Sequence, residues 1–164
     1  MTGPESSGKT TLSRQLADHY QTAWVPEYAR TYLERLDRPY RRADLLEIAK
    51  EQWRRQEEFA SRARELVICD TGLLVMKIWW EEKYGSCHPW IQQRLIDDRE
   101  SLYLLCRPDL PWEADPMREN PHDRDRLYRK YLDAAAKMKL RVFELGGGGP
   151  DRLRNALEII ERER

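Results

Sequence analysis

The segment Gly3-Pro4-Glu5-Ser6-Ser7-Gly8-Lys9-Thr10 is the most informative stretch of this 164-residue chain. It matches the pattern G-x-x-x-x-G-K-[ST] at every fixed position. The glycines let the backbone curl so that successive N–H groups point inward, and a helix that follows adds the positive end of its dipole. The segment therefore predicts a loop that binds the phosphates of a nucleoside triphosphate.

Two residues of this loop have defined tasks in such sites. We expect Lys9 to reach the β- and γ-phosphates of ATP and the Thr10 hydroxyl to ligate Mg²⁺. The residues expected to bind the nucleotide are Gly3, Glu5, Ser6, Ser7, Gly8, Lys9, Thr10 and Thr11. The alternative interpretation is a glycine-containing surface turn, and the helical period that begins directly after the segment argues against it.

Apolar runs and helical periods alternate along the chain. The apolar runs predict strands at residues 23–25, 66–69, 102–106 and 141–145. The periodic segments predict helices at residues 8–20, 28–36, 44–64, 73–83, 89–97, 124–138 and 151–162. This alternation indicates an α/β fold in which a parallel sheet lies between helices on both faces, a three-layer sandwich.

The start of the chain departs from this pattern. A strand normally precedes a phosphate-binding loop, but only Met1 and Thr2 precede Gly3. We therefore expect that the first strand is missing and that the sequence starts inside a longer chain. A sheet with a gap at its centre would be poorly stable. We expect one domain over residues 1–164, with a lid loop at 107–126.

Composition limits the possible partners. Lys plus Arg and Asp plus Glu both count 29, so the formal net charge is zero and binding to nucleic acid or membrane by bulk charge is not expected. No apolar run approaches the ~18 residues that span a bilayer. The cysteines lack metal-ligand spacing, so we expect reduced thiols and a cytoplasmic protein. The expected partners are a nucleoside triphosphate and a small-molecule acceptor, and the oligomeric state is left open.

Two carboxylates follow predicted strands. Asp70 follows the run 66–69, where it can hold Mg²⁺ through water or orient an acceptor; alternatively it caps the helix that begins near Leu73. Glu27 follows the run 23–25, at the sheet edge where ligands bind in open α/β folds. Its alternative role is to favour the N-terminus of its own helix.

The loop at 107–126 is rich in arginine. Its arginines are Arg107, Arg118, Arg124 and Arg126. Arg118 and Arg124 are the candidates to close over a triphosphate, stabilise the transferring phosphoryl group and exclude water, against the alternative of solvated surface charge.

Three further residues are candidates for substrate contact. They are Tyr28, Arg30 and Trp112. Tyr28 can stack on a base or simply pack, and Trp112 can stack or anchor its proline-rich loop to the body of the domain. The pair Trp79-Trp80 lies on a predicted helix and is interpreted as part of the core or of an interface.

Four pieces of the sequence resemble the NadR-type AAA-domain family. They are G-P-E-S-S-G-K-T-T-L at 3–12, V-P-E-Y-A-R at 25–30, Asp70-Thr71, and D-L-P-W-E-A-D-P-M-R-E at 109–119. The resemblance spans nearly the whole chain. It implies a P-loop nucleoside-kinase-like fold that uses ATP and Mg²⁺ to phosphorylate the 5′-hydroxyl of a nucleoside such as nicotinamide riboside.

The same resemblance suggests which carboxylate activates that hydroxyl, with Glu27 as the first candidate and Asp70 as the second. The chain lacks the H-x-G-H adenylyltransferase motif and the helix-turn-helix segment of the bifunctional members. The alternative function is a regulatory switch that binds and slowly hydrolyses ATP or GTP. No N-K-x-D segment occurs, and Asp70-Thr71-Gly72 fails the D-x-x-G spacing, so the sequence favours ATP and a kinase.

Overall fold

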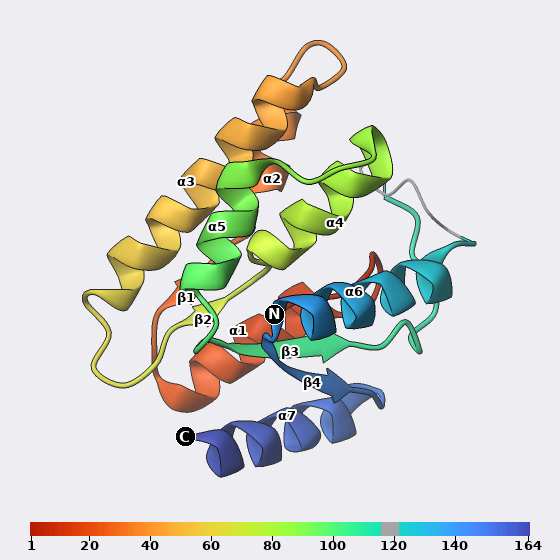
Figure 1. The fold of residues 1–164 in the computed structure, drawn as a ribbon. Coiled ribbons are helices and arrows are strands. Elements are labelled where there is room, and N and C mark those ends of the chain that lie inside the picture. Colours follow the sequence, from red (N-terminus) through yellow and green to blue (C-terminus); the bar gives the residue numbers. More distant parts are fainter. Residues whose placement is uncertain (116–121) are drawn as a thin grey trace.

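The computed structural model describes residues 1–115 and 122–164 (Figure 1). Its helices are α1 (Lys9–Tyr20), α2 (Tyr28–Glu34), α3 (Arg42–Ala60), α4 (Leu73–Tyr84), α5 (Pro89–Asp97), α6 (Arg124–Met138) and α7 (Gly149–Glu163). Its strands are β1 (Trp24–Val25), β2 (Ile68–Cys69), β3 (Leu102–Cys106) and β4 (Arg141–Leu145). All predicted elements are present, with boundaries that differ by a few residues.

The largest shift of boundaries is in α3, which begins and ends earlier than predicted. The carboxylate of Asp44 accepts a hydrogen bond from the backbone N–H of Arg41 at 2.7 Å. This bond satisfies a backbone donor that the first helical turn leaves without a partner. The helix therefore begins ahead of Asp44, although the apolar period begins only at Leu45.

The strands form two parallel pairs. β1 pairs with β2, and β3 pairs with β4 over their full lengths. Met1 and Thr2 lie between the pairs, because the Met1 ammonium donates to the Cys69 carbonyl at 2.7 Å and the Thr2 N–H donates to the Leu104 carbonyl at 2.9 Å. Among the described residues, Met1 and Thr2 alone occupy the centre of the sheet. The low stability expected from such a gap stays a prediction.

Helices cover both faces of the strands, as Figure 1 shows. α1 and α7 contact each other on one face, and α3, α4 and α6 pack on the other. Along β3, Tyr103 and Leu105 join the core under α3 to α6, whereas Leu104 and Cys106 join the core under α1 and α7. This alternation is the period of a strand buried on both faces, so the predicted three-layer α/β sandwich is confirmed.

The parallel direction of the strands determines where the loops meet. Residues that follow the carboxyl ends of neighbouring parallel strands share one edge of the sheet. Gly3 follows Thr2, Glu27 follows β1 and Asp70 follows β2, so these residues converge on that edge. No helix in the described part of the chain combines the length and apolar character required to cross a membrane.

Candidate functional site

The phosphate-binding loop turns sharply between Thr2 and α1. Gly3 has φ of 130°, and a Cβ there would lie 2.7 Å from the backbone oxygen of Cys106. Gly8 caps α1 with φ of 76°, in the left-handed region that favours glycine. The loop thus requires glycine at both fixed positions of the motif, which agrees with the predicted phosphate cradle.

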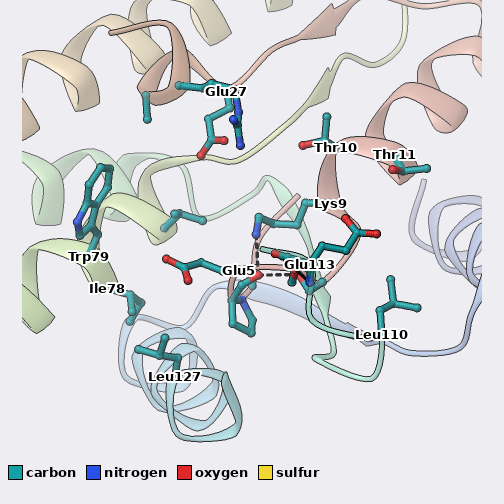
Figure 2. Close-up of a pocket in the computed structure, with 18 of the residues that line it drawn as sticks. Glu5, Lys9, Thr10, Thr11, Glu27, Ile78, Trp79, Leu110, Glu113 and Leu127 are labelled. Atoms are coloured by element: carbon teal, nitrogen blue, oxygen red, sulfur yellow. Dashed lines mark hydrogen bonds between the residues drawn. The ribbon is translucent and has the colours of Figure 1, made fainter. Parts of the chain in front are cut away.

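Side chains donate hydrogen bonds to several carbonyl groups of this loop. The Lys9 ammonium and the Ser7 hydroxyl each donate to the Pro4 carbonyl at 2.7 Å (Figure 2). The Arg124 guanidinium donates to the Ser6 carbonyl at 3.2 Å, and that of Arg152 donates to the Ser7 carbonyl at 2.9 Å. With its carbonyls held in this way, the loop can keep its N–H groups available for an anion.

A cavity of about 980 Å³ opens beside the loop. The loop, with Thr10 and Thr11 at the start of α1, lines one end of it, which we call the nucleotide end. The opposite end, which we call the acceptor end, is lined by the connection between α2 and α3 and by α4. Its wall includes Arg38, Pro39, Tyr40, Val75, Ile78 and Trp79. The cavity therefore has room for a nucleotide and a second small molecule.

Glu27 lies on the wall between the two ends. It occupies the N-cap position of α2, and its side chain makes no capping hydrogen bond. The alternative, that its charge favours the N-terminus of this helix, stays a prediction. Its carboxyl group points into the cavity in Figure 2. Burial raises the pKa of this carboxyl group, the Lys9 ammonium opposes the rise, and the nearby Asp70 carboxylate adds to it.

Asp70 is buried, with 1% of its surface exposed. Its Oδ1 atom accepts no hydrogen bond from the described residues, and Gly72, not Asp70, is the N-cap of α4. A buried carboxylate oxygen without a donor is costly unless a cation or water completes it. In the described part of the chain no cluster of His, Cys, Asp and Glu could hold a metal by itself. The unpartnered oxygen is compatible with the predicted Mg²⁺ site, but Asp70, unlike Thr10, is not among the described residues that line the cavity, so their joint role in holding Mg²⁺ stays a prediction.

Glu5 takes a direction that the motif alone does not indicate. Its side chain points towards Ile78 and Trp79, and Thr10 and Thr11 lie on the other side of Lys9 (Figure 2). The backbone of Glu5 belongs to the phosphate-binding loop, whereas its carboxylate faces the acceptor end. Its predicted contact with the nucleotide stays a prediction.

The arginines of the loop at 107–126 have different partners. Arg124 reaches the phosphate-binding loop and also donates to the Leu110 carbonyl at 2.9 Å. Arg107 pairs with Glu144 and Arg126 pairs with Glu82, both away from the loop. Arg118 lies outside the described residues. The first part of the loop predicted to be a lid contacts the phosphate-binding loop, since the Glu113 N–H donates to the Ser6 hydroxyl at 2.9 Å.

Of the three candidates for substrate contact, only one lines the cavity. Arg30 lines the cavity and pairs with Asp115 of the lid loop at 2.9 Å. Tyr28 is not among the described residues that line the cavity; the Arg55 guanidinium lies 4.4 Å from its ring. Trp112 lies under Arg124, 5.8 Å from the guanidinium, and also outside the cavity wall. Direct roles for Tyr28 and Trp112 stay predictions.

Several cavity residues were not predicted from the sequence. Trp80 is buried, as expected, but Trp79 lines the cavity, and its indole N–H donates to the Tyr40 hydroxyl at 2.9 Å. Arg152 is a buried guanidinium from the closing helix. A neighbouring Trp pair on one helix places one ring in the core and the other beside it, so that spacing could have suggested Trp79. No local signal identifies Arg152.

Comparison with known proteins identifies the family of the chain. The family model described as "AAA domain" matches residues 1–152. The trifunctional NAD biosynthesis/regulator protein NadR of Salmonella typhimurium is 28% identical over 123 residues, which are 71% of this chain and 29% of that protein. The protein of the same description from Escherichia coli matches to the same extent. The chain thus spans less than a third of the length of these curated relatives.

Solved structures support the fold. A crystal structure of NadR protein in complex with NR matches 99% of this chain and 50% of that chain, with a TM-score of 0.80 at 22% identity. A crystal structure of NadR protein in complex with NAD and AMP-PNP matches 99% and 48%, with a TM-score of 0.77 at 21% identity. The predicted P-loop kinase-like fold is therefore confirmed.

Proposed function

The chain belongs to the AAA-domain family, and on that premise we propose that it is an ATP-dependent kinase for the 5′-hydroxyl of a nucleoside such as nicotinamide riboside. The relatives of the chain are NadR proteins, and one of the similar structures contains NR. The observation that carries the proposal is the position of Glu27. Its half-buried carboxyl group faces the cavity between the phosphate-binding loop and an aromatic wall.

The nucleotide end supplies the groups that hold a triphosphate. We expect the Lys9 ammonium to exchange the Pro4 carbonyl for oxygens of the β- and γ-phosphates. The Thr10 hydroxyl and the unpartnered oxygen of Asp70 would hold Mg²⁺, which neutralises charge on the phosphates when it is bound. Arg124 already lies against the loop, and Arg118 is a further candidate for stabilising the transferring phosphoryl group.

Glu27 has the properties of a proton acceptor. In the reaction, the 5′-oxygen of the nucleoside forms a bond to the γ-phosphorus while the bond from that phosphorus to the β,γ-bridging oxygen breaks. The products are a nucleoside 5′-phosphate and ADP, and the hydroxyl proton passes to the Glu27 carboxylate. A raised pKa brings this carboxyl group closer to the operating pH, which makes it a better base.

The acceptor end supplies surfaces for a nucleoside. Trp79 and Tyr40 offer aromatic faces and edges for a flat base, and apolar side chains such as Ile78 exclude water that would compete with the acceptor. Arg30 joins α2 to the lid loop through Asp115, so it is placed to close this end. The free thiols of the three cysteines support a reducing compartment such as the cytoplasm.

The proposal is tested by incubating the protein with Mg·ATP and a panel of nucleosides that includes nicotinamide riboside. ADP and the phosphorylated nucleoside are quantified together. Phosphorylated product that forms in step with ADP, for one nucleoside, establishes the kinase and identifies its acceptor. ADP that forms slowly and that no nucleoside accelerates contradicts the proposal and supports a regulatory nucleotide switch.

A further inference from the structure

A buried carboxylate outside the reacting groups lies next to the acceptor end. Asp44, in the first turn of α3, has 4% of its surface exposed. It accepts four hydrogen bonds: from both terminal nitrogens of Arg38 at 2.8 and 2.9 Å, from the Tyr32 hydroxyl at 2.9 Å, and from the Arg41 backbone N–H at 2.7 Å. A carboxylate with this many donors is fixed in position.

Three of these hydrogen bonds join two residues of the connection between α2 and α3 to the same carboxylate. Arg38 is held at one side of the connection, and its guanidinium also donates to the Pro39 carbonyl at 3.1 Å. Arg41 is held at the other side. Tyr40 lies between the two anchored positions, so the backbone on both sides of it is fixed by the same carboxylate.

Tyr40 connects this anchored segment to the cavity wall. Its hydroxyl accepts the indole N–H of Trp79, and the two rings meet edge to face with centroids 5.2 Å apart. The Lys83 ammonium lies 5.0 Å from the centre of the Tyr40 ring. All three residues line the cavity, together with Arg38 and Pro39. The wall at the acceptor end is thus continuous with the hydrogen bonds of Asp44.

We propose that Asp44 is a positioning residue for the acceptor nucleoside: it fixes residues 38–41 so that Tyr40 and Trp79 form the acceptor wall. This inference rests on the proposed function. It assigns Asp44 no contact with the acceptor and no part in proton transfer, because none of its four hydrogen bonds comes from a group that reacts.

The charge on Asp44 is constant under assay conditions. The hydrogen bonds from Arg38, followed by that from the Arg41 backbone, hold the pKa of this carboxyl group well below its ordinary value. In Asp44→Asn, one acceptor oxygen becomes an NH₂ donor that faces other donors. The variant should therefore loosen residues 38–41 at every pH used for assay.

The test compares Asp44→Asn with Glu51→Gln, a matched control on the same helix. Glu51 also accepts hydrogen bonds from two arginines, Arg54 and Arg55, but it does not line the cavity. For Asp44→Asn we expect the KM for nicotinamide riboside to rise about tenfold, with the KM for ATP within about twofold of the wild-type value. Glu51→Gln should change neither constant.

Equal rises in both KM values, or no rise in either, would overturn the inference. If Asp44→Asn does not fold, Tyr32→Phe removes a single donor and should raise the acceptor KM by a smaller factor, again without a change for ATP. Hydrogen exchange of the Arg41 backbone N–H, which donates to Asp44, is a second measurement, and it should be faster in Asp44→Asn than in Glu51→Gln. If the wild-type protein phosphorylates no nucleoside, the proposed function fails, whereas the exchange experiment still tests the anchoring by Asp44.

Discussion

The nucleotide end and the acceptor end of the cavity are built in different ways. The nucleotide end comes mainly from one contiguous stretch, residues 3–11, whose shape is set by backbone conformation at Gly3 and Gly8, and Leu110 and Arg152 line the cavity beside it. The acceptor end is assembled from α2, the connection that follows it, and α4, which are far apart in the sequence. A contiguous site can be recognised from a motif, whereas an assembled one exists only when packing has brought its parts together.

A buried charge stabilises each end, and the two charges are opposite. A phosphate-binding loop turns its N–H groups inward and leaves carbonyl groups outside, so it needs donors, and Arg152 supplies one to the Ser7 carbonyl while it also donates to the Gly147 carbonyl in the turn before α7. The acceptor end presents two guanidinium nitrogens, a hydroxyl and a backbone N–H, so it needs an acceptor, and Asp44 is that acceptor. The two ends should therefore respond separately to mutation.

The largest effect is expected at the nucleotide end. Lys9→Ala removes the ammonium that would contact the β- and γ-phosphates, so kcat should fall by roughly 10²-fold or more, as for loss of a charge contact in a transition state. Steady-state kinetics with Mg·ATP and the acceptor measure it. Wild-type turnover in this variant would remove Lys9 from the mechanism.

Arg152→Met tests the hydrogen bonds that this guanidinium donates at the nucleotide end. The Arg152 side chain has 5% of its surface exposed and pairs with Asp109, which has 37% exposed. The variant leaves that carboxylate and two backbone carbonyls without this donor, so the free energy of unfolding should fall by about 2 kcal/mol. Chemical denaturation measures the change.

A matched control for Arg152 lies on the same helix. Arg154 also pairs with an aspartate, Asp151, but its side chain has 65% of its surface exposed. Arg154→Met should change the free energy of unfolding by less than about 0.5 kcal/mol. Binding of ATP should weaken in Arg152→Met while binding of the acceptor stays unchanged; weakened binding of both would show that the two ends are coupled.

Glu27→Gln acts at the boundary between the ends. The kcat should fall about tenfold or more, because the variant lacks the proton acceptor, while the affinity for ATP stays close to that of the wild type. In the wild type, protonation below the raised pKa of Glu27 should lower kcat on the acid side of the pH profile. The Gln variant should lack that acid limb, which pH-dependent kinetics can establish.

Protonation of Glu27 at low pH, which should lower kcat, should increase the stability of the fold. The folded protein binds the Glu27 proton more tightly than the unfolded chain, so this residue favours folding at low pH, and the contribution is lost as the pH rises through the folded-state pKa. At neutral pH, Glu27→Gln should thus be at least as stable as the wild type. A variant that is both less active and less stable would indicate a structural role instead.

The contrast between the two ends explains what could be predicted from the sequence. The loop at 3–10 and the positions of Glu27 and Asp70 follow from local patterns, since a motif and the ends of apolar runs determine them. Trp79 could be assigned only to a helix, because which of two adjacent rings faces the cavity depends on how α4 packs against its neighbours. The hydrogen-bond partners of Asp44 could not be predicted either, because nothing in the sequence distinguishes a buried carboxylate of a charged helix from its exposed ones.

The smallest effect is expected at Tyr40, and it separates the two ends most sharply. Tyr40→Phe keeps the ring and its edge-to-face contact but removes the hydroxyl that accepts the Trp79 indole N–H. A neutral hydrogen bond contributes about 1 kcal/mol, and Trp79 is only half-buried, so water can replace part of the loss. The KM for the acceptor should therefore rise about threefold, while kcat and the KM for ATP stay within error, and steady-state kinetics with each substrate varied in turn measure all three. A rise confined to ATP would contradict the assignment of Tyr40 to the acceptor end. No change at all would show that the Trp79 ring is held by packing alone, and the role of Asp44 would then be exerted through the backbone of residues 38–41.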